Sequence, residues 1–245
     1  MINPYIGEVS CFGFSFAPAG WLPCQGQLLS VQEFSQLFAV VGTAFGGDGV
    51  STFALPNFDT MTPDGGQMCI SAFGEPPTGK RDALPGEMTI FAYQSKDPSG
   101  WIECNGDVLQ IAEHAALFKI LGTTFGGDGT NTFGLPDTKS VPPFGSGSPP
   151  LLYSIVCVPS GVTEQGFQGE IKIFPSTVPP NGWLPCDGRL LPIASNTGLF
   201  SLLMTTYGGD GKTTFGLPDV TGVLPGLQAL ICQLGVYPSH PEESV

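Results

Sequence analysis

The chain carries one glycine-rich pattern three times, and this repetition restricts its fold more than any other feature. The pattern is [FY]-G-G-D-G-x-x-T-F-x-L-P-[ND]. Its copies are "FGGDGVSTFALPN" (45–57), "FGGDGTNTFGLPD" (125–137) and "YGGDGKTTFGLPD" (207–219). In each copy the first aromatic residue lies 24 residues after a tryptophan, namely Trp21, Trp101 or Trp183. Such fixed spacing indicates three tandem units.

The limits of the units follow from where the pattern lapses. The stretches 74–85 and 159–168 are rich in Pro, Gly and polar residues, as linkers are. We therefore expect units at residues 1–79, 80–164 and 165–245. A unit of about 80 residues would have modest stability alone. The three units should share apolar surface, either in a row or around a pseudo-threefold axis.

Each unit is expected to be α+β, with short strands and one short helix. "EVSCFGF", "EMTIFAY" and "EIKIFPS" each start with a glutamate, at Glu8, Glu87 and Glu170, and alternate in a β-favouring way. The stretch "SVQEFSQLFAVVG" (30–42) has helical apolar spacing, and Ser30 with Glu33 matches a capping box. An apolar run closes each unit. The three repeated glutamates are expected to accept hydrogen bonds from backbone donors.

Composition excludes several classes of function. The net charge is −13 with only 8 Lys and Arg, which argues against nucleic-acid binding and against attraction to an anionic membrane. No apolar run is long enough to cross a bilayer. The N-terminus lacks the features of a secretory signal, so we expect release by another route or a mature form.

The GGDG loop has two interpretations. Asp48, Asp128 and Asp210 could each offer a hard oxygen to a cation, but the loop lacks the ladder of acidic residues found in dedicated calcium sites. In the alternative, the glycines supply positive φ and the aspartate binds nearby backbone amides. The sequence favours the second interpretation, and we expect no metal and no cofactor.

The tryptophans and histidines offer little support for a ligand site or for catalysis. Trp21, Trp101 and Trp183 could form a sugar platform, but their apolar flanks favour core packing. His114 falls where the other units have Phe and Asn, and His240 lies in a polar tail. No nucleophile–base arrangement recurs, so the chain is not expected to be an enzyme.

Six of the seven cysteines recur in pairs. Each unit has one in its Trp segment and one in its closing run, which leaves Cys11 over. Either these pairs form three equivalent disulfides or they are buried thiols, and the repetition slightly favours bridges. The pairs are Cys24–Cys69, Cys104–Cys157 and Cys186–Cys232.

These motifs together resemble the phage tail collar domain family, which includes bacterial proteins called microcystin-dependent. The family pattern has a Gly-Glu start, G-W-x-x-C-[DN]-G-x-x-L, a Leu-Phe pair, the GGDG loop and T-F-x-L-P-[DN]. All appear in each unit, with a Gln at the [DN] position of the first. Two further features depart from the pattern: the family's Arg-rich stretch after "LPD" is missing, and Met204 replaces the glycine found at Gly42 and Gly122.

The resemblance implies a structural role without catalysis, in tail fibres or related surface assemblies. We therefore expect a protein that self-assembles into an extracellular or virion-associated appendage. Its partners would be copies of itself, other fibre proteins or cell-surface glycans. The alternative is a glycan-binding adhesin that uses the Trp and GGDG segments.

Overall fold

The structure is a computed structural model that describes residues 4–58, 66–74, 86, 88–91, 101–138, 153–156, 166–175, 179–220 and 227–239. In the first unit the elements are β1 (Glu8–Phe12), β2 (Trp21–Pro23), β3 (Leu28–Ser30), α1 (Ser35–Val41), β4 (Thr52–Ala54) and β5 (Gln67–Ser71). The second has β6 (Met88–Phe91), β7 (Trp101–Glu103), β8 (Val108–Gln110), α2 (Ala115–Leu121), β9 (Thr132–Gly134) and β10 (Tyr153–Val156). The third has β11 (Glu170–Phe174), β12 (Trp183–Pro185), β13 (Leu190–Pro192), the 3₁₀ turn η1 (Ile193–Ser195), α3 (Thr197–Leu203), β14 (Thr214–Gly216) and β15 (Gln228–Cys232). The predicted α+β class and the three units are confirmed.

Each unit contributes a three-stranded antiparallel sheet. The opening strand pairs with the closing strand, and the closing strand pairs with the Trp strand, in the orders β1-β5-β2, β6-β10-β7 and β11-β15-β12. In the first unit Ser10 lies opposite Cys69, and Trp21 lies opposite Ser71. The sequence repeat is therefore also a repeat of strand order.

The three sheets join in a closed cycle around a pseudo-threefold axis. The first half of each opening strand pairs with the second half of the opening strand of a neighbouring unit, so β1, β6 and β11 each contact both others. The three equivalent pairs are Val9–Ile90, Met88–Ile173 and Ile171–Cys11. Of the two expected arrangements, the ring is the one that forms.

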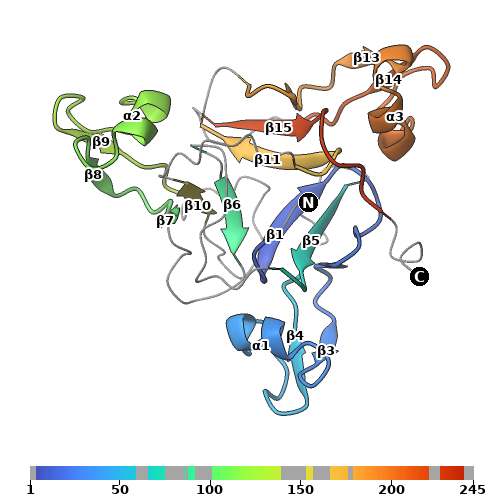
Figure 1. The fold of residues 1–245 in the computed structure, drawn as a ribbon, viewed down its shortest axis with the longest axis horizontal. Helices are drawn as coiled ribbons and strands as arrows, with labels where there is room; N and C mark the ends of the chain where they lie inside the picture. The colour runs from blue at the N-terminus through green and yellow to red at the C-terminus, as the bar shows by residue number, and fades with distance from the viewer. Residues whose placement is uncertain are drawn as a thin grey trace.

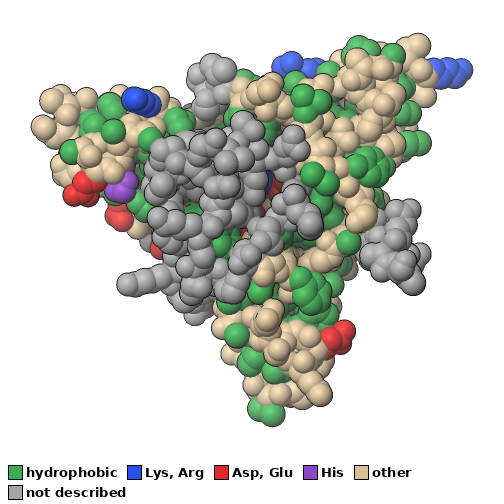
Figure 2. All heavy atoms as spheres, in the orientation of Figure 1, with side chains coloured by type: hydrophobic (Ala, Val, Ile, Leu, Met, Phe, Trp, Pro, Cys, Tyr) green, Lys and Arg blue, Asp and Glu red, His purple; other side chains and the backbone are tan. Residues whose placement is uncertain are grey.

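Three arms extend outward from the ring (Figure 1), and they form three lobes in the space-filling view (Figure 2). Each arm holds two paired strands, and the chain between them forms a seven-residue helix followed by the GGDG loop. The helix presents its apolar face to the core, with Leu37 and Val41 buried in α1. The phenylalanine of the "TF" pair that follows every loop is fully buried, as Phe53, Phe133 and Phe215. One cluster of buried apolar residues extends through all three units.

The predicted capping box is wrong. Ser30 is the last residue of β3, and its Oγ accepts a 3.4 Å hydrogen bond from the amide of Glu33. This bond closes a turn ahead of the helix, which begins at Ser35 after Phe34 and has no side-chain cap. Residues 31–34 therefore lie between the serine of the cap pattern and the first residue of the helix.

Candidate functional site

The GGDG loops have the same internal hydrogen bonds in all three arms. Oδ1 of Asp48 accepts hydrogen bonds from the backbone amides of Val50, Ser51 and Thr52 at 2.8–2.9 Å. Oδ1 of Asp128 and of Asp210 accepts the corresponding three amides at 2.7–2.9 Å. Each aspartate therefore organises the loop that follows it.

The second oxygen of the aspartate also has a partner in two of the arms. Oδ2 of Asp48 accepts the Ser51 hydroxyl at 2.6 Å, and Oδ2 of Asp210 accepts the Thr213 hydroxyl at 2.7 Å. The hydroxyl and amide hydrogen bonds favour the ionised form, so the pKa of each of the three exposed carboxyl groups is well below its usual value. The largest single cause is the Ser51 hydroxyl for Asp48, and a backbone amide for Asp128 and for Asp210.

The glycines of the loop are required by its geometry. At Gly47, φ is 93°, and a Cβ would lie 2.4 Å from the Cα of Phe53. The loop thus passes against the strand that follows it, where no side chain fits. Within the described part of the chain, no group of three or more His, Cys, Asp or Glu residues is placed to hold a metal ion. The described loops fit the geometric interpretation of the motif.

The three tryptophans are all buried, with 4–6% of their surface exposed. Trp21 packs edge-on against Phe12, with 5.3 Å between ring centroids, and Phe167 of the third unit lies 6.4 Å away. Trp183 packs similarly on Phe174 at 5.4 Å. Trp21 and Trp183 therefore belong to aromatic clusters of the ring, and the burial of all three tryptophans leaves no open stacking face.

The predicted disulfides Cys24–Cys69 and Cys186–Cys232 are not present in the structure. The six described cysteines are buried free thiols, and Cys157, the predicted partner of Cys104, lies outside the described residues. Cys24 and Cys186 belong to the central core, whereas Cys69 and Cys232 pack with Trp21 and Trp183 in separate clusters. The two cysteines of each predicted bridge therefore point to different sides of the sheet. Knowing which strands are neighbours does not by itself reveal this difference.

The strand-opening glutamates lie near the pseudo-threefold axis, and the prediction that they bind backbone donors is confirmed for two of them. Oε2 of Glu8 accepts the amide of Tyr5 at 3.0 Å, and Oε2 of Glu170 accepts that of Phe167 at 3.0 Å. Glu87 lies outside the described residues. Sequence reasoning missed Lys172, which is 93% buried beside Glu170. Lys172 occupies the position of Ser10 and Thr89 in the repeat, but three polar residues there give no sign that the position is buried.

The histidines take no part in a described polar cluster. His114 precedes α2 as its N-cap residue without a side-chain cap bond, and His240 lies outside the described residues. Among the described helices, none is both long and apolar enough to span a membrane.

Comparison with known proteins agrees with this geometry. The model of the Phage Tail Collar Domain matches residues 7–63, 86–143 and 169–225, which together make up more than half of the chain. The chain belongs to the phage tail collar domain family. Each match starts at the Gly-Glu pair and runs past the GGDG loop, so one match falls on each unit of the ring. No curated protein and no solved structure gives a significant match to this collar protein. Membership places it among structural components of phage tail fibres.

Proposed function

We propose that this collar protein is a non-enzymatic structural subunit that self-assembles into a fibre by stacking the faces of its rings. The observation that carries the proposal is the closed cycle of β1, β6 and β11. In a row of units, the terminal units would each leave a joining edge free for another chain. The closed ring uses these edges within one molecule, so growth must occur through other surfaces.

The outer edges of the ring are poor sites for joining by strand addition. Its edge strands β2, β7 and β12 are three residues long each. Two of them end on a proline, Pro23 and Pro185, which has no amide hydrogen to donate. Assembly through the sheet edges is therefore disfavoured.

Three exposed apolar residues support stacking. Leu28, Val108 and Leu190 are 62%, 60% and 57% exposed, and each lies seven residues after the tryptophan of its unit. Because they occupy equivalent positions in the arm strands β3, β8 and β13, the pseudo-threefold axis relates them as three matched contacts at one height along the axis. Such a set fits the face of a second copy that shares the axis, and burial of these side chains would favour association.

The test replaces all three residues with serine and measures assembly by light scattering and negative-stain microscopy. We expect the unchanged protein to form axial stacks as its concentration rises, and the triple variant to remain single rings. Val50→Ser is the matched control, because Val50 is 82% exposed in the first arm but has Thr130 and Lys212 as counterparts. A monomer at all concentrations would overturn self-assembly, whereas stacking by the triple variant would overturn this choice of surface.

The glycan-binding alternative has less support from the geometry. It depends on the tryptophans, which are 4–6% exposed, and on aspartates whose Oδ1 atoms accept hydrogen bonds from their own loops. Glycan-array binding that is lost when Asp48, Asp128 and Asp210 become Asn, with stacking retained, would favour it.

A further inference from the structure

A group of polar side chains is buried where the three inner strands meet. Each is at most 7% exposed: Glu8, Ser10, Thr89, Glu170 and Lys172. They come from β1, β6 and β11, and so from all three units. Charged groups in such a place are costly unless they are paired and hydrogen-bonded. The contacts of these side chains therefore affect the stability of the ring.

The hydrogen bonds in this axial cluster run from one unit to the next. The Ser10 hydroxyl of the first unit donates to Oε1 of Glu170 in the third, at 2.9 Å. The Thr89 hydroxyl of the second unit donates to Oε1 of Glu8 in the first, at 3.5 Å. Ser10 and Thr89 hold the same position, two residues after the glutamate that opens the strand. The cluster thus repeats one polar link around the axis.

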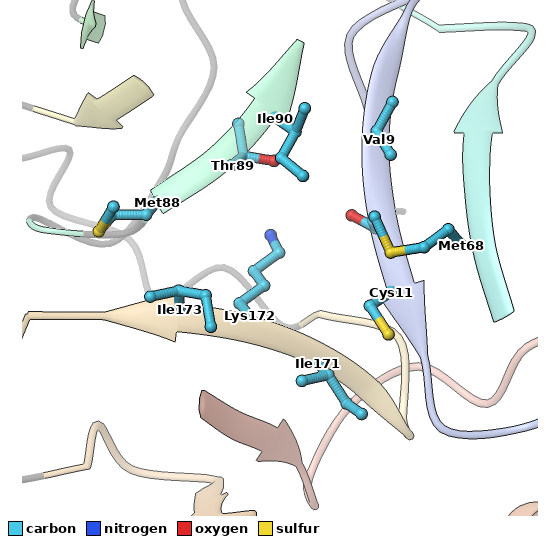
Figure 3. A pocket seen from close by; sticks show the side chains of 10 residues that line it. Val9, Cys11, Met68, Met88, Thr89, Ile90, Ile171, Lys172 and Ile173 are labelled. Carbon is cyan, nitrogen blue, oxygen red and sulfur yellow. The ribbon is translucent and has the colours of Figure 1, made fainter. Parts of the chain in front are cut away.

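At the third equivalent position the chain has Lys172 instead of a hydroxyl residue. Its Nζ lies 3.6 Å from Oε1 of Glu170, the oxygen that also accepts the Ser10 hydroxyl. In Figure 3 the lysine side chain reaches from β11 toward the space between β6 and β1. Ser10, Thr89 and Lys172 line a cavity of about 10 Å³ there, which leaves room for about one water molecule. The three units therefore each contribute one of these residues to the same cavity at the axis.

We propose that Lys172 balances the charge of the buried glutamates, and that the axis needs one lysine which any of the three equivalent positions can supply. Hydroxyl groups satisfy the hydrogen bonds of Glu8 and Glu170 but carry no charge. Glu8 and Glu170, the strand-opening glutamates that the structure describes, are like charges near one axis, and such charges repel each other strongly in a poorly solvated interior. An ammonium group among them offsets this repulsion. Fusion of three units in one chain allows a single lysine at the axis, whereas three identical chains would place three.

The test moves the lysine around the ring. Lys172→Ser restores the residue of the first unit and removes the charge, and Lys172→Met removes the charge at similar volume. We expect each to lower the melting temperature by roughly 10 °C, since breaking a buried pair leaves an uncompensated charge. Ser10→Lys combined with Lys172→Ser places the amine between Glu8 and Glu170. We expect this relocated variant to recover at least half of the loss.

Acid provides a second readout. As pH falls into the range where carboxylates gain protons, the deficit of Lys172→Ser relative to the unchanged protein should shrink. Among the described titratable groups, Glu8 belongs to the same axial cluster, and the thiols of Cys11 and Cys232 respond to the Glu170 charge. Burial, with the Glu170 charge second, raises the pKa of each thiol to about 12, so the two thiols stay neutral throughout this range.

The outcomes separate charge balance from simple packing. Unchanged stability of Lys172→Ser and Lys172→Met would overturn the proposal, as would a relocated variant no more stable than Lys172→Ser alone. If Lys172→Ser does not fold, soluble yield and thermal unfolding of the relocated variant decide, because only charge balance predicts its rescue.

Discussion

The hydroxyl of Tyr207 donates a 3.1 Å hydrogen bond to the backbone carbonyl oxygen of Gly13. This bond connects the arm of the third unit with the end of the first strand of the first unit, 194 residues earlier in the chain. The equivalent residues in the other arms are Phe45 and Phe125, which have no hydroxyl. The contact between the last and first units therefore includes a hydrogen bond that only a tyrosine at this [FY] position can form.

Replacement of Tyr207 by Phe tests this link. The change removes the partly buried hydrogen bond and should lower the free energy of unfolding by about 1 kcal/mol. For a chain of this size that corresponds to a fall of roughly 2–4 °C in melting temperature. Tyr237→Phe is the control, because its hydroxyl contacts Ser201 in an exposed position. Equal effects of the two changes would argue against a specific role for the Tyr207–Gly13 bond.

The sequence predicts the repeated parts of this structure well, because each depends on local chemistry. The GGDG glycines, the helices before them and the strand-opening glutamates follow from backbone conformation and short-range hydrogen bonds. The family resemblance rests on the same residues, and the match to the family model confirms it. The burial of Phe53 and its counterparts is likewise predicted by the local sequence.

The relationship between the units could not be predicted from the sequence in the same way. A row and a ring bury similar strands, and the choice depends on pairs such as Cys11–Ile171, which are 160 residues apart. The alternating pattern of "EIKIF" also gives no sign that Lys172 is buried, because closure of the ring supplies the cover. The predicted bridges Cys24–Cys69 and Cys186–Cys232 are absent from the structure for a related reason, since residues on neighbouring strands can face opposite sides of a sheet.

Met204 should be a strained residue at the end of α3. Among the described residues it is the one non-glycine with positive φ, at 49° with ψ −132°, close to the values at Gly42 and Gly122. L-residues rarely adopt this conformation, which costs of order 1–3 kcal/mol. Met204→Gly is therefore expected to raise stability by about 1 kcal/mol, as measured by chemical denaturation.

The reverse change supplies the control for Met204. A Cβ at Gly122 would meet nothing within 4 Å, so Gly122→Met tests backbone strain without a steric clash. We expect it to lower stability by a similar amount. If both changes destabilise the protein, backbone conformation does not determine the cost at this position.

The GGDG aspartates should make stability depend on acid. Their folded-state pKa values lie below the unfolded value of about 3.9. The stabilisation they provide is therefore complete above about pH 4 and is lost as the pH falls further toward the folded values. Asp48→Asn, Asp128→Asn and Asp210→Asn together should flatten the dependence of the urea midpoint on pH below 4. The same slope in variant and parent would show that other carboxylates cause it.

The buried thiols should be unreactive in the folded protein. Burial raises the pKa of Cys11 and Cys232 to about 12, and it also raises the pKa of Cys24, Cys69 and Cys186, so the nucleophilic thiolate is scarce at pH 8. Iodoacetamide without reductant is expected to leave these five residues unmodified in native protein. In denaturant the same reagent should modify all five within minutes, as read by peptide mass mapping. Modification in denaturant that appears only after reduction would instead show that Cys24–Cys69 or Cys186–Cys232 is bridged, and would require those side chains to turn to the same side of the sheet.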